Sequence, residues 1–227
     1  MSGTPRLVEV RQRVLKENDL VARELRDGFG RAGVLAVSLV SSPGAGKTTL
    51  LQKTLLRLRE HCRMAVLVGD LATDNDARRL ASTGVRTQQI TTGTVCHLEA
   101  EMIRSAIRDW NLRELDLLFI ENVGNLVCPA SFDLGESLRA VLLSVTEGED
   151  KPLKYPPIFH TADVTVLTKL DLAEAAGFDR ALAERNLAAV RPGMQVLGVS
   201  ARTGQGMDEW IGLLTSQLHA CRRPRTP

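Results

Sequence analysis

Short apolar runs alternate with amphipathic segments along most of the chain. Six runs have the length of buried strands and cover residues 34–40, 64–68, 115–120, 140–145, 164–167 and 196–199. Between them, apolar residues fall at helical spacing among polar ones. Such alternation predicts an α/β fold in which a mostly parallel sheet is flanked by helices.

The N-terminal segment predicts an amphipathic helix from Arg6 to Phe29. Its apolar residues recur at roughly helical spacing and are Leu7, Val10, Val14, Ala22, Leu25 and Phe29. Gly28, Gly30 and Gly33 are expected to end this helix. We therefore expect a helix in residues 1–30 packed on a single domain of residues 31–220, with a tail at 221–227.

Charge and hydropathy exclude several functions. The 29 Lys and Arg residues balance the 27 Asp and Glu residues, which gives no electrostatic reason to expect nucleic acid as a partner. No apolar run approaches the roughly 18 residues of a membrane span, and the N-terminus has no secretory apolar segment. We therefore expect a cytoplasmic protein with no membrane partner. Its four cysteines form no CxxC pair and are expected to be thiols or metal ligands.

A phosphate-binding loop follows the first predicted strand. The sequence SSPGAGKTTL at residues 41–50 leads directly into a helical pattern, as a Walker A loop requires. Lys47 is expected to reach the β- and γ-phosphates, and the Thr48 hydroxyl to bind Mg²⁺. Ser41 replaces the first Gly of the strict pattern. The residues expected to contact nucleotide here are Gly44, Ala45, Gly46, Lys47, Thr48 and Thr49.

Two later segments resemble the guanine-reading elements of GTPases. Thr168-Lys169-Leu170-Asp171 is similar to NKxD, with Thr in place of Asn, and Ser200-Ala201 is similar to SAx. The Asp171 carboxylate can accept from both N–H groups of guanine, Lys169 can cover the base, and the Ala201 N–H can meet the guanine carbonyl. GTP is therefore the predicted nucleotide, with ATP as the alternative.

Acidic residues follow two of the predicted strands. We expect Asp70 and Asp76 to position Mg²⁺ or the attacking water, and Glu121 to act as a second acid, with the Gly124 N–H near the γ-phosphate. Glu121-Asn122-Val123-Gly124 has Glu where small GTPases have Asp, and so resembles the dimer-forming P-loop class that includes metal-insertion GTPases. Asp74 or Asp76 could instead cap the following helix. No residue is marked as an arginine finger, so we expect a Mg²⁺-dependent GTPase with slow intrinsic hydrolysis.

Cys96, His97 and Cys128 form a candidate metal site. Thiolates and an imidazole suit Ni²⁺ or Zn²⁺, and three ligands leave one position open. Cys96 and His97 are expected to open a helix. Taken alone the pattern is weak evidence, because buried cysteines are common in cores.

Several long segments closely resemble the HypB family of hydrogenase nickel-incorporation GTPases. They include SSPGAGKTTLL, GDLATDNDA, FIENVGNLVCPASFDLGE and SVTEGEDKPLKYP. The resemblance implies a GTP-dependent homodimer that acts with a HypA-type partner to deliver nickel to the large subunit of [NiFe]-hydrogenase. It also implies that Cys96, His97 and Cys128 are metal ligands. We further expect metal bound at the dimer interface to be coupled to the nucleotide state, because the short loop from Glu121 to Cys128 carries both Gly124 and a thiolate.

Two alternatives remain from the sequence. A urease-type nickel accessory GTPase would be expected to carry a Cys-Pro-His motif, which this sequence lacks. A non-enzymatic scaffold would bind nucleotide and metal without turnover.

Overall fold

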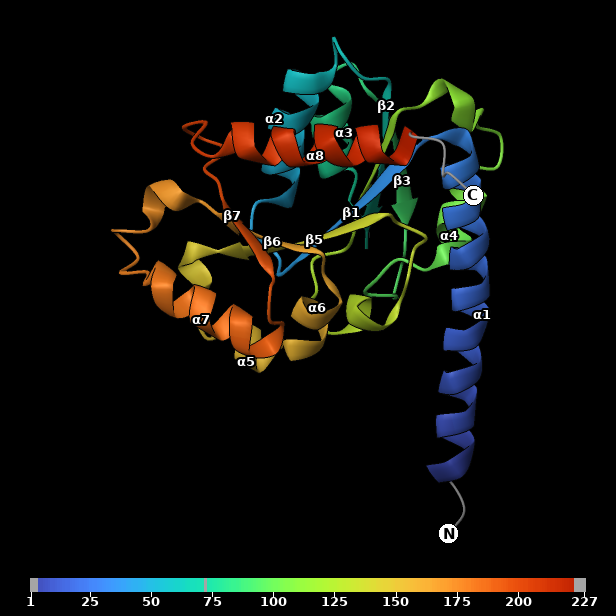
Figure 1. The fold of residues 1–227 in the computed structure, drawn as a ribbon. Coiled ribbons are helices and arrows are strands. Elements are labelled where there is room, and N and C mark those ends of the chain that lie inside the picture. The colour runs from blue at the N-terminus through green and yellow to red at the C-terminus, as the bar shows by residue number, and fades with distance from the viewer. Residues whose placement is uncertain (1–3, 72, 223–227) are drawn as a thin grey trace.

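One parallel sheet forms the centre of the molecule (Figure 1). The structure is a computed structural model and describes residues 4–71 and 73–222. Within these residues the sheet has seven strands in the order β3-β2-β4-β1-β5-β6-β7, and every pairing is parallel. The strands are β1 (Leu35–Ser41), β2 (Met64–Asp70), β3 (Arg86–Thr91), β4 (Leu117–Glu121), β5 (Leu138–Ser144), β6 (Val164–Thr168) and β7 (Gln195–Gly198). The predicted α/β class is confirmed.

Helices cover both faces of this sheet. They are α1 (Thr4–Ala32), α2 (Lys47–Leu58), α3 (Asn75–Ala81), α4 (Ala100–Ala106), α5 (Lys151–Lys154), α6 (Pro156–Thr161), α7 (Arg180–Val190) and α8 (Met207–Arg222). Short 3-10 helices cover Leu112–Glu114, Cys128–Ser131, Val145–Glu147 and Leu170–Leu172. No helix in the described part of the chain has the length and apolar character needed to cross a membrane.

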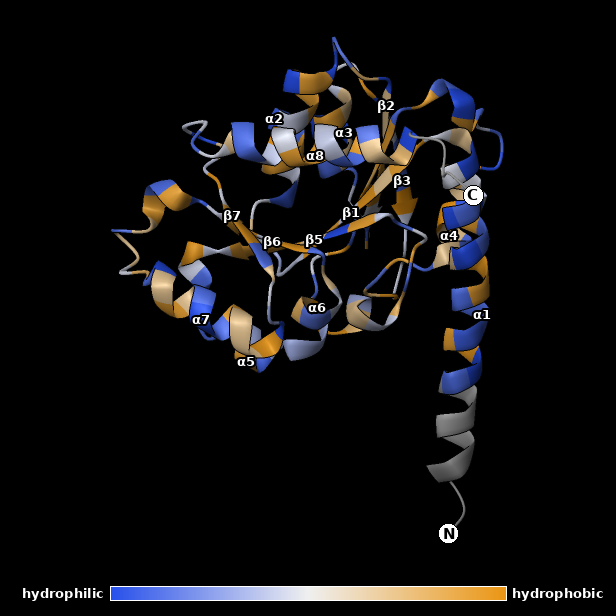
Figure 2. Cartoon of the chain, in the orientation of Figure 1, coloured by the Kyte–Doolittle hydropathy of each residue, from blue (hydrophilic) through white to orange (hydrophobic). Residues whose placement is uncertain are grey.

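Alternate residues of each strand point to opposite faces, which explains the long apolar runs. In β1, Leu35 and Val37 pack in the core beneath α2, α3 and α8. Ala36 packs with α1 and α4 on the other face. A third cluster joins β5 and β6 to α6 and α7. Figure 2 shows the strands as mostly hydrophobic and the outward helix faces as mostly hydrophilic.

The N-terminal helix is longer than the sequence indicated. Ala22, Leu25 and Phe29 are buried against α4 as expected, but Val14 is 41% exposed. Gly28 and Gly30 lie inside α1 and do not end it, because a helix tolerates glycine at modest cost when packing supports it. The helix ends before Gly33, which has a φ of 70°. Residues 1–3 and the side chains of residues 4–11 lie outside what the structure describes.

Other boundaries differ by a few residues. The polar strand β3 (Arg86–Thr91) was not predicted, because its sequence RTQQIT has no apolar run. Helix α8 continues to Arg222, two residues into the expected tail, and residues 223–227 lie outside the described residues.

The strand register brings the predicted site elements together. Glu121 at the end of β4 is aligned with Leu39 of β1 and with Val68 of β2. The loops that follow β1, β2 and β4 therefore leave the same edge of the sheet, where open parallel sheets bind ligands.

Candidate functional site

The Walker A loop connects β1 to α2 and forms one wall of a cavity of about 480 Å³. Gly44 and Gly46 have φ values of 75° and 100°, which other residues rarely adopt, and this lets the backbone curl toward the helix start. Of the six loop residues predicted to contact nucleotide, only Ala45 does not line the cavity. Its carbonyl instead accepts a hydrogen bond of 2.7 Å from Thr168 Oγ1.

Lys47 lies folded back across this loop. Its Nζ donates a hydrogen bond of 3.0 Å to Ser41 Oγ, so the serine that departs from the strict pattern holds the lysine head. Burial lowers the pKa of Lys47, against the opposing charges of Glu121 and Asp76.

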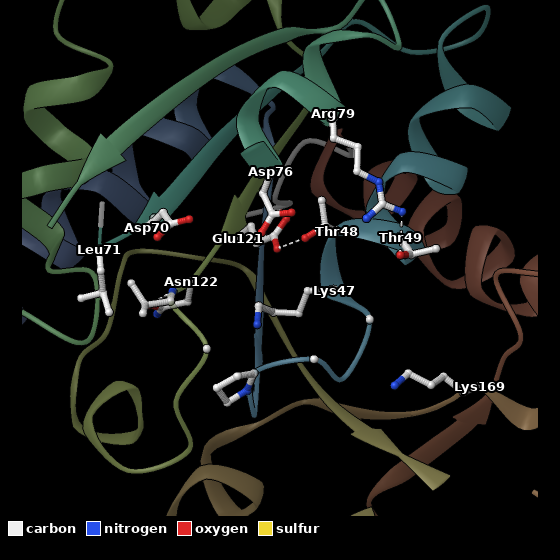
Figure 3. Close-up of a pocket in the computed structure, with 16 residues that line it drawn as sticks. Lys47, Thr48, Thr49, Asp70, Leu71, Asp76, Arg79, Glu121, Asn122 and Lys169 are labelled. Atoms are coloured by element: carbon white, nitrogen blue, oxygen red, sulfur yellow. Dashed lines mark hydrogen bonds between the residues drawn. The ribbon is translucent and has the colours of Figure 1, made fainter. Parts of the chain in front are cut away.

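Thr48 and Glu121 face each other across the cavity floor (Figure 3). Thr48 Oγ1 donates to Glu121 Oε1 at 2.7 Å, and Glu121 is only 3% exposed. Burial raises the pKa of Glu121 to about 7, although the Thr48 hydrogen bond and the Lys47 charge act against this shift. Glu121 Oε2 has no hydrogen-bond partner among the described residues. A buried carboxylate oxygen without a partner, beside a hydroxyl, is a donor set that fits Mg²⁺.

Asp70 and Asp76 also line this cavity. Asp70 Oδ2 accepts from Thr73 Oγ1 at 2.8 Å, and Asp76 lies in the first turn of α3. Asp74 occupies the N-cap position of α3 but makes no side-chain cap, because its Oδ2 accepts from Arg78 Nε at 2.7 Å. The Asp74 side chain therefore does not cap α3, and Asp76 lines the cavity.

Gly124 brings the loop after β4 against the Walker loop. A Cβ atom at position 124 would lie 2.9 Å from Pro43 Cα, a distance that side chains do not tolerate. The absence of a side chain at position 124 therefore lets the two loops pack in direct contact.

The guanine-reading segments line a second, smaller cavity beside the first. Lys169, with a left-handed φ of 59°, contributes to both cavities, and Asp171 and Ala201 line the smaller one. Ser200 is fully buried and does not line it. Its Oγ instead donates to Asp171 Oδ1 at 2.6 Å and so orients the predicted base-reading carboxylate. Thr168, which replaces the usual Asn, ties this segment to the Walker loop through Ala45.

Cys96, His97 and Cys128 meet within a single chain. One ligand atom from each lies within 4.8 Å of the others, and the two Sγ atoms are 2.9 Å apart. His97 packs on Phe132 with ring centroids 4.0 Å apart. Burial lowers the pKa of His97, against an opposing effect of Glu99, which favours the neutral imidazole that metal binding requires. Neither ring nitrogen has a hydrogen-bond partner among the described residues, although Nε2 lies 3.4 Å from Glu99 Oε1.

The two cysteine segments differ from expectation in local structure. Cys96 and His97 lie in the loop before α4, which begins only at Ala100, so they do not open that helix. Cys128 begins the 3-10 helix Cys128–Ser131.

The loop that carries Cys96 and His97 is joined directly to the wall of the phosphate cavity. Asn122, which follows Glu121 and lines the cavity, accepts hydrogen bonds from the backbone N–H of Leu98 at 3.0 Å and of Val123 at 2.9 Å. On the other side of Leu98 lies Gly69, where a Cβ atom would come within 2.7 Å of Leu98 Cγ. Leu98, next to His97, is therefore held between the ends of β2 and β4.

Sequence reasoning missed two residues of this site, Asn122 and Arg79. Asn122 lay inside a quoted motif, and its position after a strand-end acid was the available signal. Arg79 lines the phosphate cavity from α3. Its signal was the spacing of three residues from Asp76, which places both side chains on one helix face.

This chain is similar in sequence and structure to members of one family of nucleotide-binding proteins. Residues 35–198 match the family described as CobW/HypB/UreG, nucleotide-binding domain. Hydrogenase maturation factor HypB of Azotobacter chroococcum mcd 1 is 48% identical over 220 residues, which are 97% of this chain and 72% of that protein. A crystal structure of HypB from Helicobacter pylori in complex with nickel has a TM-score of 0.85 and 36% identity, covering 93% of this chain and 99% of that one. The HypB structure from Archaeoglobus fulgidus has a TM-score of 0.83 and 37% identity, covering 89% of this chain and 99% of that one. This chain therefore belongs to the CobW/HypB/UreG family, among its HypB members.

Proposed function

We propose that this protein is a GTP-hydrolysing nickel metallochaperone that assists nickel insertion into [NiFe]-hydrogenase. The observation that carries the proposal is the convergence of Cys96, His97 and Cys128 on one point. The loop that carries Cys96 and His97 is fixed to the wall of the phosphate cavity by Asn122. The names of the HypB relatives and the nickel complex of one of them support the same role.

GTP is bound across the two cavities. The N–H groups at the start of α2 and the Lys47 ammonium bind the β- and γ-phosphates, and Lys47 exchanges its contact with Ser41 for them. Asp171, oriented by Ser200, accepts from the guanine ring N–H and amino group. Lys169 covers the base and the Ala201 N–H meets its carbonyl.

Hydrolysis uses the acids that line the phosphate cavity. Thr48 and Glu121 would hold Mg²⁺, which offsets the charge of the phosphates when bound. Asp70 and Asp76 position the attacking water, and the Gly124 N–H contacts the γ-phosphate. Catalysis of this kind depends on positioning and electrostatics, and without an arginine finger the intrinsic rate is slow.

Nickel is the cargo of the second site. Two thiolates and a neutral imidazole from one chain leave at least one position open for a ligand from water or from a second copy of the protein. Zn²⁺ fits the same donors. The open position is consistent with a site completed at the interface of a homodimer, in which GTP and metal each favour association.

The remaining assignments follow family membership. The domain predicted for residues 31–220 carries both sites, and helix α1 packs on it through α4. In a cytoplasmic homodimer, the protein would receive or pass nickel through a HypA-type partner and deliver it to the hydrogenase large subunit. A urease-type role and a non-enzymatic scaffold are the competing functions.

Two variants separate the proposed function from the non-enzymatic scaffold. Lys47→Ala should abolish GTP turnover through loss of its phosphate contact and leave nickel stoichiometry unchanged. Cys128→Ala should remove most nickel binding and leave the GTP affinity of the monomer nearly unchanged. Single-turnover hydrolysis, nickel dialysis and a melting curve for each protein complete the test. A wild type that binds GTP without hydrolysing it would support the scaffold instead, and equal nickel binding by Cys128→Ala would remove the metal site.

A further inference from the structure

Arg79 reaches into the phosphate cavity from α3. Its Nη2 donates a hydrogen bond of 2.8 Å to Thr49 Oγ1, and its Nε donates one of 3.3 Å to Gln52 Oε1. Figure 3 shows the guanidinium above the start of α2, on the opposite side of Thr48 from Asp70. Gln52 also donates to the backbone carbonyl of Arg79 at 3.5 Å, so the base of the side chain is held to α2.

The hydrogen-bond partners of this guanidinium carry no negative charge, so its positive charge can act on an anion in the cavity. Both acceptors, Thr49 and Gln52, are neutral, so the positive charge is not cancelled by a carboxylate at either contact. The neighbouring Arg78 differs, because its Nε lies 2.7 Å from Asp74 Oδ2 and its side chain is 77% exposed. Of the two adjacent arginines, Arg78 is therefore paired with a carboxylate, whereas Arg79 lines the cavity without one.

Thr49 fixes which part of a nucleotide Arg79 meets. Thr49 lines both the phosphate cavity and the cavity of Lys169 and Asp171, so it lies at the junction of the two. Glu121, by contrast, faces Thr48 and lines only the phosphate cavity. A nucleotide with its base beside Asp171 and its terminal phosphate beside Glu121 would therefore place its α-phosphate at the Thr49 junction.

We propose that Arg79 is a nucleotide-binding residue that holds the α-phosphate, releasing its contact with Thr49 when nucleotide enters. A planar guanidinium offers paired N–H donors that match phosphate oxygens. Arg79 is exposed and bound to a hydroxyl, so it can turn these donors to a phosphate with little reorganisation. The inference rests on the proposed binding of GTP in this cavity. Since GDP and GTP share the α-phosphate, Arg79 strengthens the binding of both and contributes little to the rate of bond cleavage.

The test compares Arg79→Gln and Arg79→Lys with the matched control Arg78→Gln. Affinities for GDP and for a non-hydrolysable GTP analogue are measured by calorimetry, and turnover is measured at saturating GTP. Loss of a charged hydrogen bond predicts that Arg79→Gln weakens both nucleotides by the same factor, about ten- to a hundredfold. Turnover at saturation should stay within about threefold, Arg79→Lys should recover part of the affinity, and Arg78→Gln should match the wild type.

Other results overturn the inference. Unchanged affinities in Arg79→Gln would leave Arg79 as a tether between α3 and α2, detectable only as a lower melting temperature. A large fall in turnover at unchanged affinity would make it a group that acts on the γ-phosphate. A selective loss of the GTP analogue would exclude the α-phosphate. A wild type that is folded, as its melting curve shows, but binds no GTP would contradict the proposed function as well as this inference.

Discussion

Asn122 Oδ1 accepts a hydrogen bond of 3.0 Å from the backbone N–H of Leu98. This contact joins the end of β4, where Glu121 faces the phosphate cavity, to the loop that carries Cys96 and His97. Asn122 is 2% exposed, so the bond is shielded from water and its loss cannot be replaced by solvent. We therefore expect a change in the loop after β4 on nucleotide binding to be transmitted to Cys96 and His97.

Replacing Asn122 with Ala should weaken this link. Two buried N–H groups, of Leu98 and Val123, lose their acceptor, so the free energy of unfolding should fall by about 1–3 kcal/mol. The ratio of nickel affinities between the GTP-analogue and GDP states should move toward one. Asn122→Asp keeps an acceptor oxygen and serves as the conservative variant. An Asn122→Ala protein that stays folded and keeps the wild-type ratio would exclude Asn122 from the coupling.

Asp171→Asn should change the choice of base. An amide at this position can donate to the carbonyl that xanthine carries where guanine has an amino group, so binding of xanthine nucleotide should improve and that of GTP should weaken. Ser200→Ala should weaken GTP more mildly, because Asp171 keeps its carboxylate but loses the hydroxyl that orients it. Competition between GTP and XTP for each variant measures the effect. A preference for GTP that is unchanged in Asp171→Asn would remove this residue from the base site.

Asp116 should make stability depend on acid pH. Burial alone would raise the pKa of Asp116, but hydrogen bonds from Arg63 and the charge of Arg222 outweigh burial, and the pKa lies below its ordinary value. A carboxyl with a depressed folded pKa adds stability above its unfolded pKa of about 3.9, and this stability is lost as pH falls through the folded pKa. Asp116 is 6% exposed and accepts from Arg63 Nη2 at 2.6 Å.

Urea unfolding of Asp116→Asn measures this contribution. The free energy of unfolding should fall by about 1–2 kcal/mol at pH 7, and the difference from wild type should shrink toward pH 3. The exposed pair of Asp208 with Arg57 gives a control, because Asp208→Asn should change stability little at either pH. A difference that stays constant across this range would contradict the charge-based account.

The sequence predicted those elements that are specified by residues close together in the chain. The Walker loop needs a strand, a glycine turn and a helix in immediate succession, and all three lie within residues 35–58. Strand β3 was missed because it lies at the sheet edge with intermediate or exposed side chains, where no apolar run is required.

The parts of the site that depend on tertiary contacts could not be predicted in the same way. Cys96 and Cys128 are 32 residues apart, and only the positions of β3 and β4 in the sheet bring their sulfur atoms together. Residue types alone made them a weak candidate for a metal site, and the resemblance to the HypB family strengthened that expectation. The roles of Ser41, Thr168 and Ser200 as partners of Lys47, Ala45 and Asp171 likewise appear only in the fold.

Equilibrium dialysis of nickel shows whether this protein couples nickel binding to the nucleotide at its P-loop. Wild type and Cys128→Ala are compared at matched protein concentration, each with GDP and with a non-hydrolysable GTP analogue. We expect the wild type to bind nickel at least about fivefold more tightly with the GTP analogue than with GDP, because linked sites strengthen each other's binding. Cys128→Ala should bind little nickel in either state. Equal nickel binding by the two proteins, or equal wild-type affinity in the two nucleotide states, would contradict the account.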